Sequence, residues 1–223
     1  MSEEKVYEVP AAIAEQAHID AEEYAVMYQH SVENPDDFWG EQAEQFVTWF
    51  KRWDSVSDWS FDPDNLHISW FKGGKLNVSY NCLDRHLEKR GDQVAIIWES
   101  DNPELDRKIT YRELHAEVSK FANVLKSKGV KKGDRVCIYL PMIPEAAVAM
   151  LACTRIGAVH SIVFGGFSPD SLRDRILDSD CQVVITSDES VRGGRHVPLK
   201  KNADRAMDEC PNVHTMIVVR RTG

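Results

Sequence analysis

Continuous apolar runs, separated by amphipathic stretches, fill the chain from about residue 77 onward. The runs are uniformly apolar rather than alternating, which is typical of strands buried on both faces of a parallel sheet. The expected strands are residues 93–98, 135–140, 159–164, 182–186 and 213–219. The pattern predicts an α/β fold in which a parallel-rich sheet carries helices on both faces.

Helix-starting residues mark the amphipathic stretches between these strands. Thr110 and Glu113 have the spacing of a capping box, and the helix that they open should end near Gly129. Ser168 is a suitable N-cap and Pro169 suits the first position of a helix. The other expected helices are residues 77–89, 144–156, 168–179 and 198–209.

Residues 1–75 differ in character from the rest and hold five of the six tryptophans. Asp20 should cap a helix over 21–32, and Asn34 a second helix that begins at Pro35. The second helix should carry aromatic residues at helical spacing: Phe38, Trp39, Phe46, Trp49 and Phe50. Such stripes usually pack, so we interpret residues 1–75 as a helical N-terminal cap and extended arm, and residues 76–223 as an α/β subdomain.

The composition excludes several classes of function. The chain has 223 residues, of which 43% are hydrophobic and 28% charged, as in globular proteins. Its net charge of −9 argues against binding to nucleic acid or to an acidic membrane. No apolar run is long enough to span a membrane, and the acidic N-terminus lacks a signal-peptide core. We therefore expect a cytoplasmic chain without nucleic-acid or membrane partners.

The cysteines and the standard motifs indicate no metal or catalytic centre. The five cysteines form no CxxC pair, which favours free thiols in a reducing compartment. The phosphate-loop, dinucleotide-binding, zinc-protease and serine-hydrolase motifs are all missing from the sequence. We expect no catalytic residue and no metal ligand in this chain.

A pair of glycines follows the expected strand 159–164. Gly165 and Gly166 lie between this strand and a capped helix. Adjacent glycines let a ligand approach the backbone closely, and a helix N-terminus favours negative charge. A tight turn that needs glycine for its dihedral angles is a slightly better explanation from this segment alone.

Two arginines that flank two glycines follow the expected strand 182–186. Arg192 and Arg195 carry guanidinium groups that match phosphate oxygens bidentately, and flexible glycines between them would let both reach one phosphate or a pair. Solvated surface arginines explain the pattern equally well. Ligands of open α/β sheets bind beyond the carboxyl ends of the strands. Together the two loops therefore predict a site for a phosphate-bearing molecule.

Several longer motifs occur in a fixed order. They are NPDDFWGE (34–41), NCLDRH (81–86), AIIWE (95–99), ITYREL (109–114), YLPMIPEAAVAMLACTRIGAVHSIV (139–163), FGGFSP (164–169), VVITSD (183–188), RGGR (192–195) and PLKK (198–201). Together they closely resemble the AMP-forming acetyl-CoA synthetase family of the acyl-adenylate-forming superfamily. The resemblance covers nearly the whole chain.

The resemblance implies an ATP-dependent acetate–CoA ligase that works through an acetyl-adenylate and releases AMP and pyrophosphate. Its substrates would be acetate, ATP and CoA, with Mg²⁺ assisting. The family's Ser/Thr/Gly-rich phosphate loop and catalytic lysine lie downstream of the residues present here. The chain would therefore be part of the large N-terminal domain of an adenylate-forming enzyme, inactive alone and partnered by the remainder of the same polypeptide.

The same resemblance assigns part of a CoA site to this chain. Arg192 and Arg195 would hold phosphates of the 3′-phospho-ADP end of CoA, and the glycine pair would line its approach. The implied CoA-binding residues are Phe164, Gly165, Gly166, Arg192, Gly193, Gly194 and Arg195. Two alternatives stay open: a free-standing CoA- or nucleotide-binding regulatory module, and a ligase for a slightly larger acid such as propionate.

Overall fold

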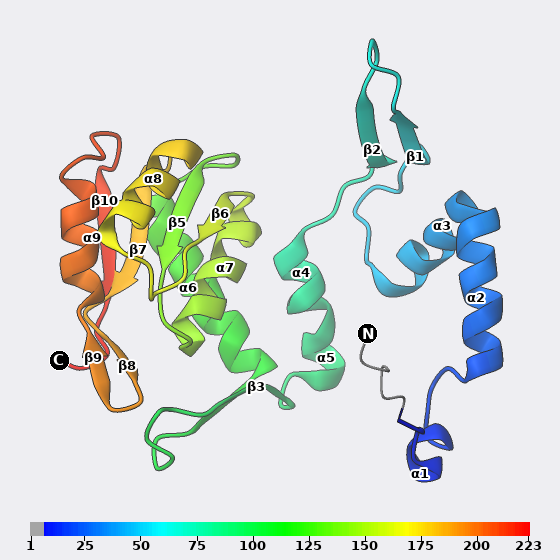
Figure 1. Ribbon diagram of the computed structural model, residues 1–223, viewed down its shortest axis with the longest axis horizontal. Coiled ribbons are helices and arrows are strands. Elements are labelled where there is room, and N and C mark those ends of the chain that lie inside the picture. The colour runs from blue at the N-terminus through cyan, green and yellow to red at the C-terminus, as the bar shows by residue number, and fades with distance from the viewer. Residues whose placement is uncertain (1–6) are drawn as a thin grey trace, which may run out of the picture. The chain divides into compact units, whose positions relative to one another are not determined.

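The structure is a computed structural model that describes residues 7–223. These residues divide between Lys75 and Leu76 into two compact units (Figure 1). The smaller unit precedes this division and the larger one follows it. Each is described by itself.

The smaller unit begins with helices α1 (Ala11–Ala14), α2 (Ala21–Glu33) and α3 (Pro35–Phe46). Asp20 caps α2 in a full capping box with Glu23, which confirms the predicted start of this helix. Helix α3 begins at Pro35 as predicted, although the Asn34 side chain makes no capping hydrogen bond.

The predicted length of the second helix is wrong, because α3 ends at Phe46 and the backbone is extended at Val47. Trp49 instead packs in an aromatic cluster with Trp53 and Phe71, with ring centroids 4.9–5.4 Å apart. Beside this cluster, strands β1 (Ser55–Ser60) and β2 (His67–Lys72) form an antiparallel hairpin. A long-range cluster of rings thus outweighed the helical spacing.

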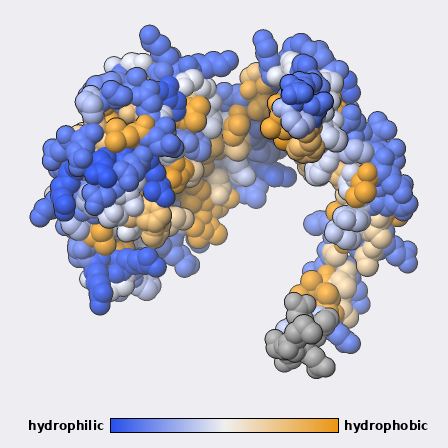
Figure 2. Space-filling model, turned by 45° about the horizontal axis from the view of Figure 1, so that its top comes forward, coloured by the Kyte–Doolittle hydropathy of each residue, from blue (hydrophilic) through white to orange (hydrophobic). Residues whose placement is uncertain are grey.

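Few apolar side chains of the smaller unit are buried. Within the described residues up to 75, the buried apolar side chains are Ala43 and Trp53. The others are half-buried or exposed, and Figure 2 shows orange patches among hydrophilic residues.

The larger unit is built on a parallel sheet, which confirms the predicted α/β fold. Within residues 76–223 this sheet has four strands in the order β10 (Thr215–Val219), β7 (Val183–Ser187), β5 (Arg135–Tyr139) and β6 (Val159–Ile162). All of its neighbouring pairs are parallel. The covering helices are α6 (Tyr111–Ser127), α7 (Pro144–Ile156), α8 (Pro169–Ser179) and α9 (Leu199–Met207).

Alternate strand residues contribute to two separate cores on the two faces of the sheet. Val136 and Ile138 pack with buried residues of α6 and α7. Their neighbours Cys137 and Tyr139 pack with buried residues of α8 and α9. Because both faces are covered, the strands carry the continuous apolar runs seen in the sequence (Figure 1).

The predicted caps start the helices on both faces of the sheet. The Thr110 hydroxyl accepts the Glu113 N–H at 3.2 Å, and the Glu113 carboxylate accepts the Thr110 N–H at 2.8 Å. Ser168 caps α8 by accepting the N–H of Ser171 at 3.3 Å. These two predictions are confirmed.

The predicted helix over 77–89 is wrong as a continuous element. It breaks into α4 (Val78–Cys82), the 3₁₀ turn η1 (Asp84–His86) and α5 (Leu87–Arg90). The break falls at Leu83, which is buried in the core with φ −126° and ψ −66°. Asp84 then pairs bidentately with Arg155 of α7 at 2.8 and 2.9 Å, so tertiary contacts hold this segment to the body.

The prediction that strand 93–98 joins the parallel sheet is also wrong. This strand, β3 (Val94–Trp98), pairs antiparallel with β4 (Arg107–Thr110), which the sequence pattern did not reveal. The loop after β7 holds a second short hairpin, β8 (Ser190–Arg192) and β9 (Arg195–Val197), where the pattern predicted only a loop. In the part of the chain that the structure describes, no helix has the length and apolarity needed to cross a bilayer.

Candidate functional site

The order of the parallel strands creates a point at which the chain reverses its direction across the sheet. From β5 the chain passes through α7 to β6 on one side, and then through α8 to β7 on the other side of β5. Helices α7 and α8 pack on opposite faces. In open α/β sheets, ligands bind in the crevice outside the carboxyl ends of the strands at this switch point.

A cavity of about 420 Å³ opens at these carboxyl ends. It is bordered by the segments that follow β5, β6, β7 and β10, and by the β3–β4 loop. Its lining includes Trp98, Asp101, Leu140, Met142, Phe164, Gly165, Gly166, Ser190, Val191, Arg192, Val197 and Arg221. The structure therefore brings Phe164, Gly165, Gly166 and Arg192, which the sequence had proposed on separate loops, to one cavity.

Close packing explains why residues 165 and 166 are both glycines. A Cβ at Gly165 would lie 3.3 Å from the carbonyl oxygen of Leu140, and one at Gly166 would lie 2.5 Å from a ring carbon of Phe164. Neither glycine has a positive φ. The explanation that the turn needs glycine for its dihedral angles is therefore wrong. Lack of space against the end of β5 and the Phe164 ring accounts for the pair.

Tyr139, at the end of β5, is hydrogen-bonded to the loop that carries these glycines. Its side chain is fully buried, and its hydroxyl donates to the Phe167 carbonyl oxygen at 2.8 Å. The Asn202 amide donates to the same hydroxyl at 3.5 Å. Burial raises the pKa of Tyr139, so the phenol remains a donor at neutral pH. Sequence reasoning missed this residue, because its only signal was a tyrosine inside an apolar strand.

The variant Tyr139→Phe should be destabilised by about 1–3 kcal/mol, since a buried hydrogen bond is lost without a change in shape. Urea unfolding followed by circular dichroism measures this difference. Tyr111→Phe is a matched control, because the Tyr111 hydroxyl has no hydrogen bond within the described residues. Equal stability of the two variants would contradict the role of Tyr139.

The two arginines flank a tight hairpin turn, which differs from the flexible loop that the sequence suggested. Gly193 and Gly194 have φ values of +56° and +71°, as the central residues of a type I′ turn require. Arg192 and Arg195 are paired directly across β8 and β9, so their side chains leave the same face. Within residues 7–223, neither guanidinium group has an ion pair or a side-chain hydrogen bond. Both are exposed and available to an anion.

The backbone of this turn is already bonded. The carboxylate of Asp101, in the β3–β4 loop, accepts the N–H of Gly193 at 2.8 Å and that of Gly194 at 2.9 Å. Gly193, Gly194 and Arg195 therefore form the hairpin tip and do not line the cavity, whereas Arg192 does. Sequence reasoning missed Asp101, because the two glycines that it contacts lie more than 90 residues away in the sequence.

Asp188, just after β7, holds the segment that follows β10 in place. Its carboxylate accepts the N–H groups of Glu189, Arg221, Thr222 and Gly223 at 2.8–3.2 Å. Partial burial alone would raise the pKa of Asp188, but these hydrogen bonds outweigh it and hold the pKa at about 2. The ionised carboxylate thus places Arg221 on the wall of the cavity.

The described part of the chain has neither a metal-ligand cluster nor a thiolate at Cys137 or Cys153. No group of three or more His, Cys, Asp or Glu side chains there is placed to hold a metal ion. Burial raises the pKa of the Cys137 and Cys153 thiols, the latter to about 12, so neither is a thiolate near neutral pH.

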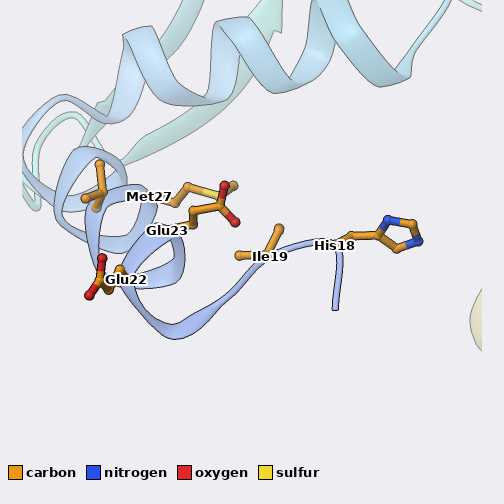
Figure 3. A pocket seen from close by; sticks show the side chains of 6 residues that line it. His18, Ile19, Glu22, Glu23 and Met27 are labelled. Atoms are coloured by element: carbon orange, nitrogen blue, oxygen red, sulfur yellow. The ribbon is translucent and has the colours of Figure 1, made fainter. Parts of the chain in front are cut away.

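The smaller unit has a hollow of about 440 Å³ along the start of α2. Figure 3 shows its lining, in which the His18 imidazole points away from Glu22 and Glu23. The Glu23 carboxylate already accepts the Asp20 N–H at 3.1 Å in the capping box. These side chains form no catalytic arrangement, so the cavity at the sheet is the stronger candidate site.

The larger unit is a doubly wound α/β fold with a cavity at the carboxyl ends of its strands, the place where ligands bind in proteins of this architecture. Two family models match the chain: "AMP-binding enzyme" over residues 83–223 and "Acetyl-coenzyme A synthetase N-terminus" over residues 24–82. The chain belongs to the AMP-binding enzyme family. These matches confirm the resemblance that the motifs indicated.

Individual relatives agree with the family models. The chain is 66% identical to acetyl-coenzyme A synthetase of Magnetococcus marinus and 62% identical to that of Halorhodospira halophila, in both cases over 100% of this chain and 34% of the relative. Acetoacetyl-CoA synthetase from Streptomyces lividans has a similar structure, with a TM-score of 0.83 and 30% identity over 96% of this chain and 32% of that one. The chain thus spans about a third of the length of the curated relatives it matches.

Proposed function

We propose that this chain is the N-terminal portion of an ATP-dependent acetate–CoA ligase and contributes part of its CoA site. The ligase joins acetate to CoA through an acetyl-adenylate and releases AMP and pyrophosphate. One observation carries the assignment of the site: the Phe164–Gly166 loop and the arginine hairpin border the same cavity at the switch point.

The residues at this cavity fit a ligand with a phosphorylated nucleotide end. Arg192 and Arg195 lack partners within residues 7–223 and project from one face of the hairpin, where they can hold phosphate oxygens. The cavity walls include apolar side chains such as Leu140 and Val197, which suit an adenine ring or a pantetheine chain. The glycine pair lets this loop pack closely against the end of β5, and the loop then forms one wall of the cavity.

ATP, Mg²⁺ and acetate belong to the proposed reaction of the whole enzyme. We assign no residue of this chain to them and no catalytic residue. The chain should therefore act with the remainder of the same polypeptide, which would supply the adenylation chemistry.

The purified chain of 223 residues should show no acetate-dependent exchange between ATP and pyrophosphate, because we assign it no group that activates acetate. Radiolabelled pyrophosphate exchange measures this directly. As a positive control, the polypeptide captured from the source cells with an antibody against this segment should have a mass well above 25.4 kDa and should catalyse the exchange. Robust exchange by the purified chain would contradict the proposal.

The same capture separates the proposal from a free-standing CoA-binding module. A product of 25.4 kDa in the cells, without exchange activity but with submicromolar affinity for CoA, would favour the module.

A ligase for a larger acid is the second candidate. The similar solved structure is named for acetoacetate, whereas relatives at 60–66% identity are named for acetate. Comparing kcat/KM for acetate and propionate in the captured polypeptide decides between the two acids.

A further inference from the structure

The β3–β4 hairpin is attached to the sheet at its base. The indole N–H of Trp98 donates to the Met142 carbonyl oxygen at 2.8 Å. On the other strand, the guanidinium of Arg107 binds the Glu145 carboxylate at 3.2 Å, at the first turn of α7. These contacts fix both strands where the β3–β4 loop begins and ends. Part of that loop then borders the cavity.

The tip of this loop is attached to the arginine hairpin by one side chain. Asp101 uses both carboxylate oxygens, one for the Gly193 N–H at 2.8 Å and the other for the Gly194 N–H at 2.9 Å. The two N–H groups converge because both glycines have positive φ, a backbone arrangement that binds anions. The contact joins segments more than 90 residues apart in the sequence.

Such an anchor matters because the arginine hairpin is short. Strands β8 and β9 have three residues each, and a two-stranded hairpin of this size is marginally stable alone. The anchored glycines lie between Arg192 and Arg195, so the contact with Asp101 restrains the backbone next to both arginines.

From this arrangement we infer that Asp101 is a positioning residue for the phosphate-binding arginines. It holds the hairpin tip so that Arg192 and Arg195 are oriented for the phosphorylated end of the ligand before the ligand binds. Affinity for the ligand increases because the two arginines are already ordered before the ligand binds. The inference deepens the proposed function and rests on it, because it concerns the same site.

Asp101 does not itself bind the phosphate. The N–H groups of Gly194 and Gly193 hold the pKa of Asp101 below its usual range, so the carboxylate is ionised at neutral pH and would repel an anion. Because Asp101 occupies the N–H groups of the turn, the phosphate is left to the guanidinium groups. A competing role has the opposite consequence: if Asp101 mainly neutralised the arginines, its removal would strengthen phosphate binding.

The test compares binding of CoA and dephospho-CoA to the 223-residue chain by ligand-observed NMR, which measures weak affinities. The variant Asp101→Ala should weaken CoA binding at least about fivefold and change dephospho-CoA binding less than about twofold. Asp101→Asn keeps the shape and one acceptor oxygen, so its effect should be smaller. Asp106→Ala is the matched control, since Asp106 is exposed in the same loop and has no hydrogen bond within the described residues.

A second measurement follows the anchor without any ligand. Amide hydrogen exchange at Gly193 and Gly194 should become faster in Asp101→Ala and remain unchanged in Asp106→Ala. Suppose that the native chain prefers CoA to dephospho-CoA, but that Asp101→Ala binds CoA as tightly as the native chain or more tightly. That result would overturn the inference about Asp101 and leave the proposed function standing. A native chain without that preference would overturn the proposed function at this site, and the inference with it.

Discussion

The double variant Arg192→Ala, Arg195→Ala should lose affinity for CoA by about 100-fold, with little change in affinity for dephospho-CoA. Each charge-assisted hydrogen bond contributes roughly 1.5–3 kcal/mol, and two such contacts to one phosphate give at least this factor. Both side chains leave the same face of a tight hairpin, so both can reach the same group. Titration calorimetry or ligand-observed NMR with the two ligands measures the effect.

The control for this experiment is Arg205→Ala on α9, which removes an equal charge from a helix outside the cavity. It should lower CoA affinity less than about twofold, because a distant exposed charge is screened by salt. Equal losses in Arg205→Ala and in the hairpin variant would mean that overall charge governs binding, and the assigned site would be wrong.

The sequence predicted the elements whose signals are local. The apolar runs around 135–140 and 182–186 became central strands, because each is buried on both faces of the sheet. The capping box at Thr110 and the N-cap at Ser168 each depend on residues three positions apart, so the sequence displays them directly. The switch point, which follows from the order of the strands, placed the two candidate loops at one end of the sheet.

The contacts that shape the site depend on residues far apart in the sequence. The hydrogen bonds of Asp101 with Gly193 and Gly194, and that of Tyr139 with Phe167, form only once the sheet and both hairpins are in place. The short strands β8 and β9 have no apolar alternation of their own. Local patterns therefore identified the loops of the site but not the contacts that hold them.

Removal of the Asp188 carboxylate should give one of the larger losses of stability available in this chain. In Asp188→Ala, the N–H groups at Glu189, Arg221, Thr222 and Gly223 lose their acceptor, and the segment that follows β10 loses its side-chain attachment to the end of β7. The free energy of unfolding should fall by about 2–3 kcal/mol. Urea unfolding at pH 7 measures it, with Asp178→Ala as a control on the exposed surface of α8 that should change stability by less than about 0.5 kcal/mol.

The same carboxylate makes part of the stability depend on pH. The folded pKa of Asp188 is about 2, below the usual 3.8, so folding favours the ionised form. Its contribution is therefore fully present above about pH 4 and is lost as the pH falls towards 2. The shift corresponds to about 2 kcal/mol. Asp188→Asn removes this titration while other carboxylates continue to titrate in both proteins.

The difference in unfolding free energy between the native chain and Asp188→Asn should thus be about 2 kcal/mol at pH 6 and should shrink towards zero near pH 2. Taking the difference cancels the titration of the remaining groups. A difference that stays constant between pH 6 and pH 2 would show that the charge of Asp188 does not hold the segment after β10 to the end of β7. The position of Arg221 on the cavity wall would then need another explanation, because it follows the same hydrogen bonds.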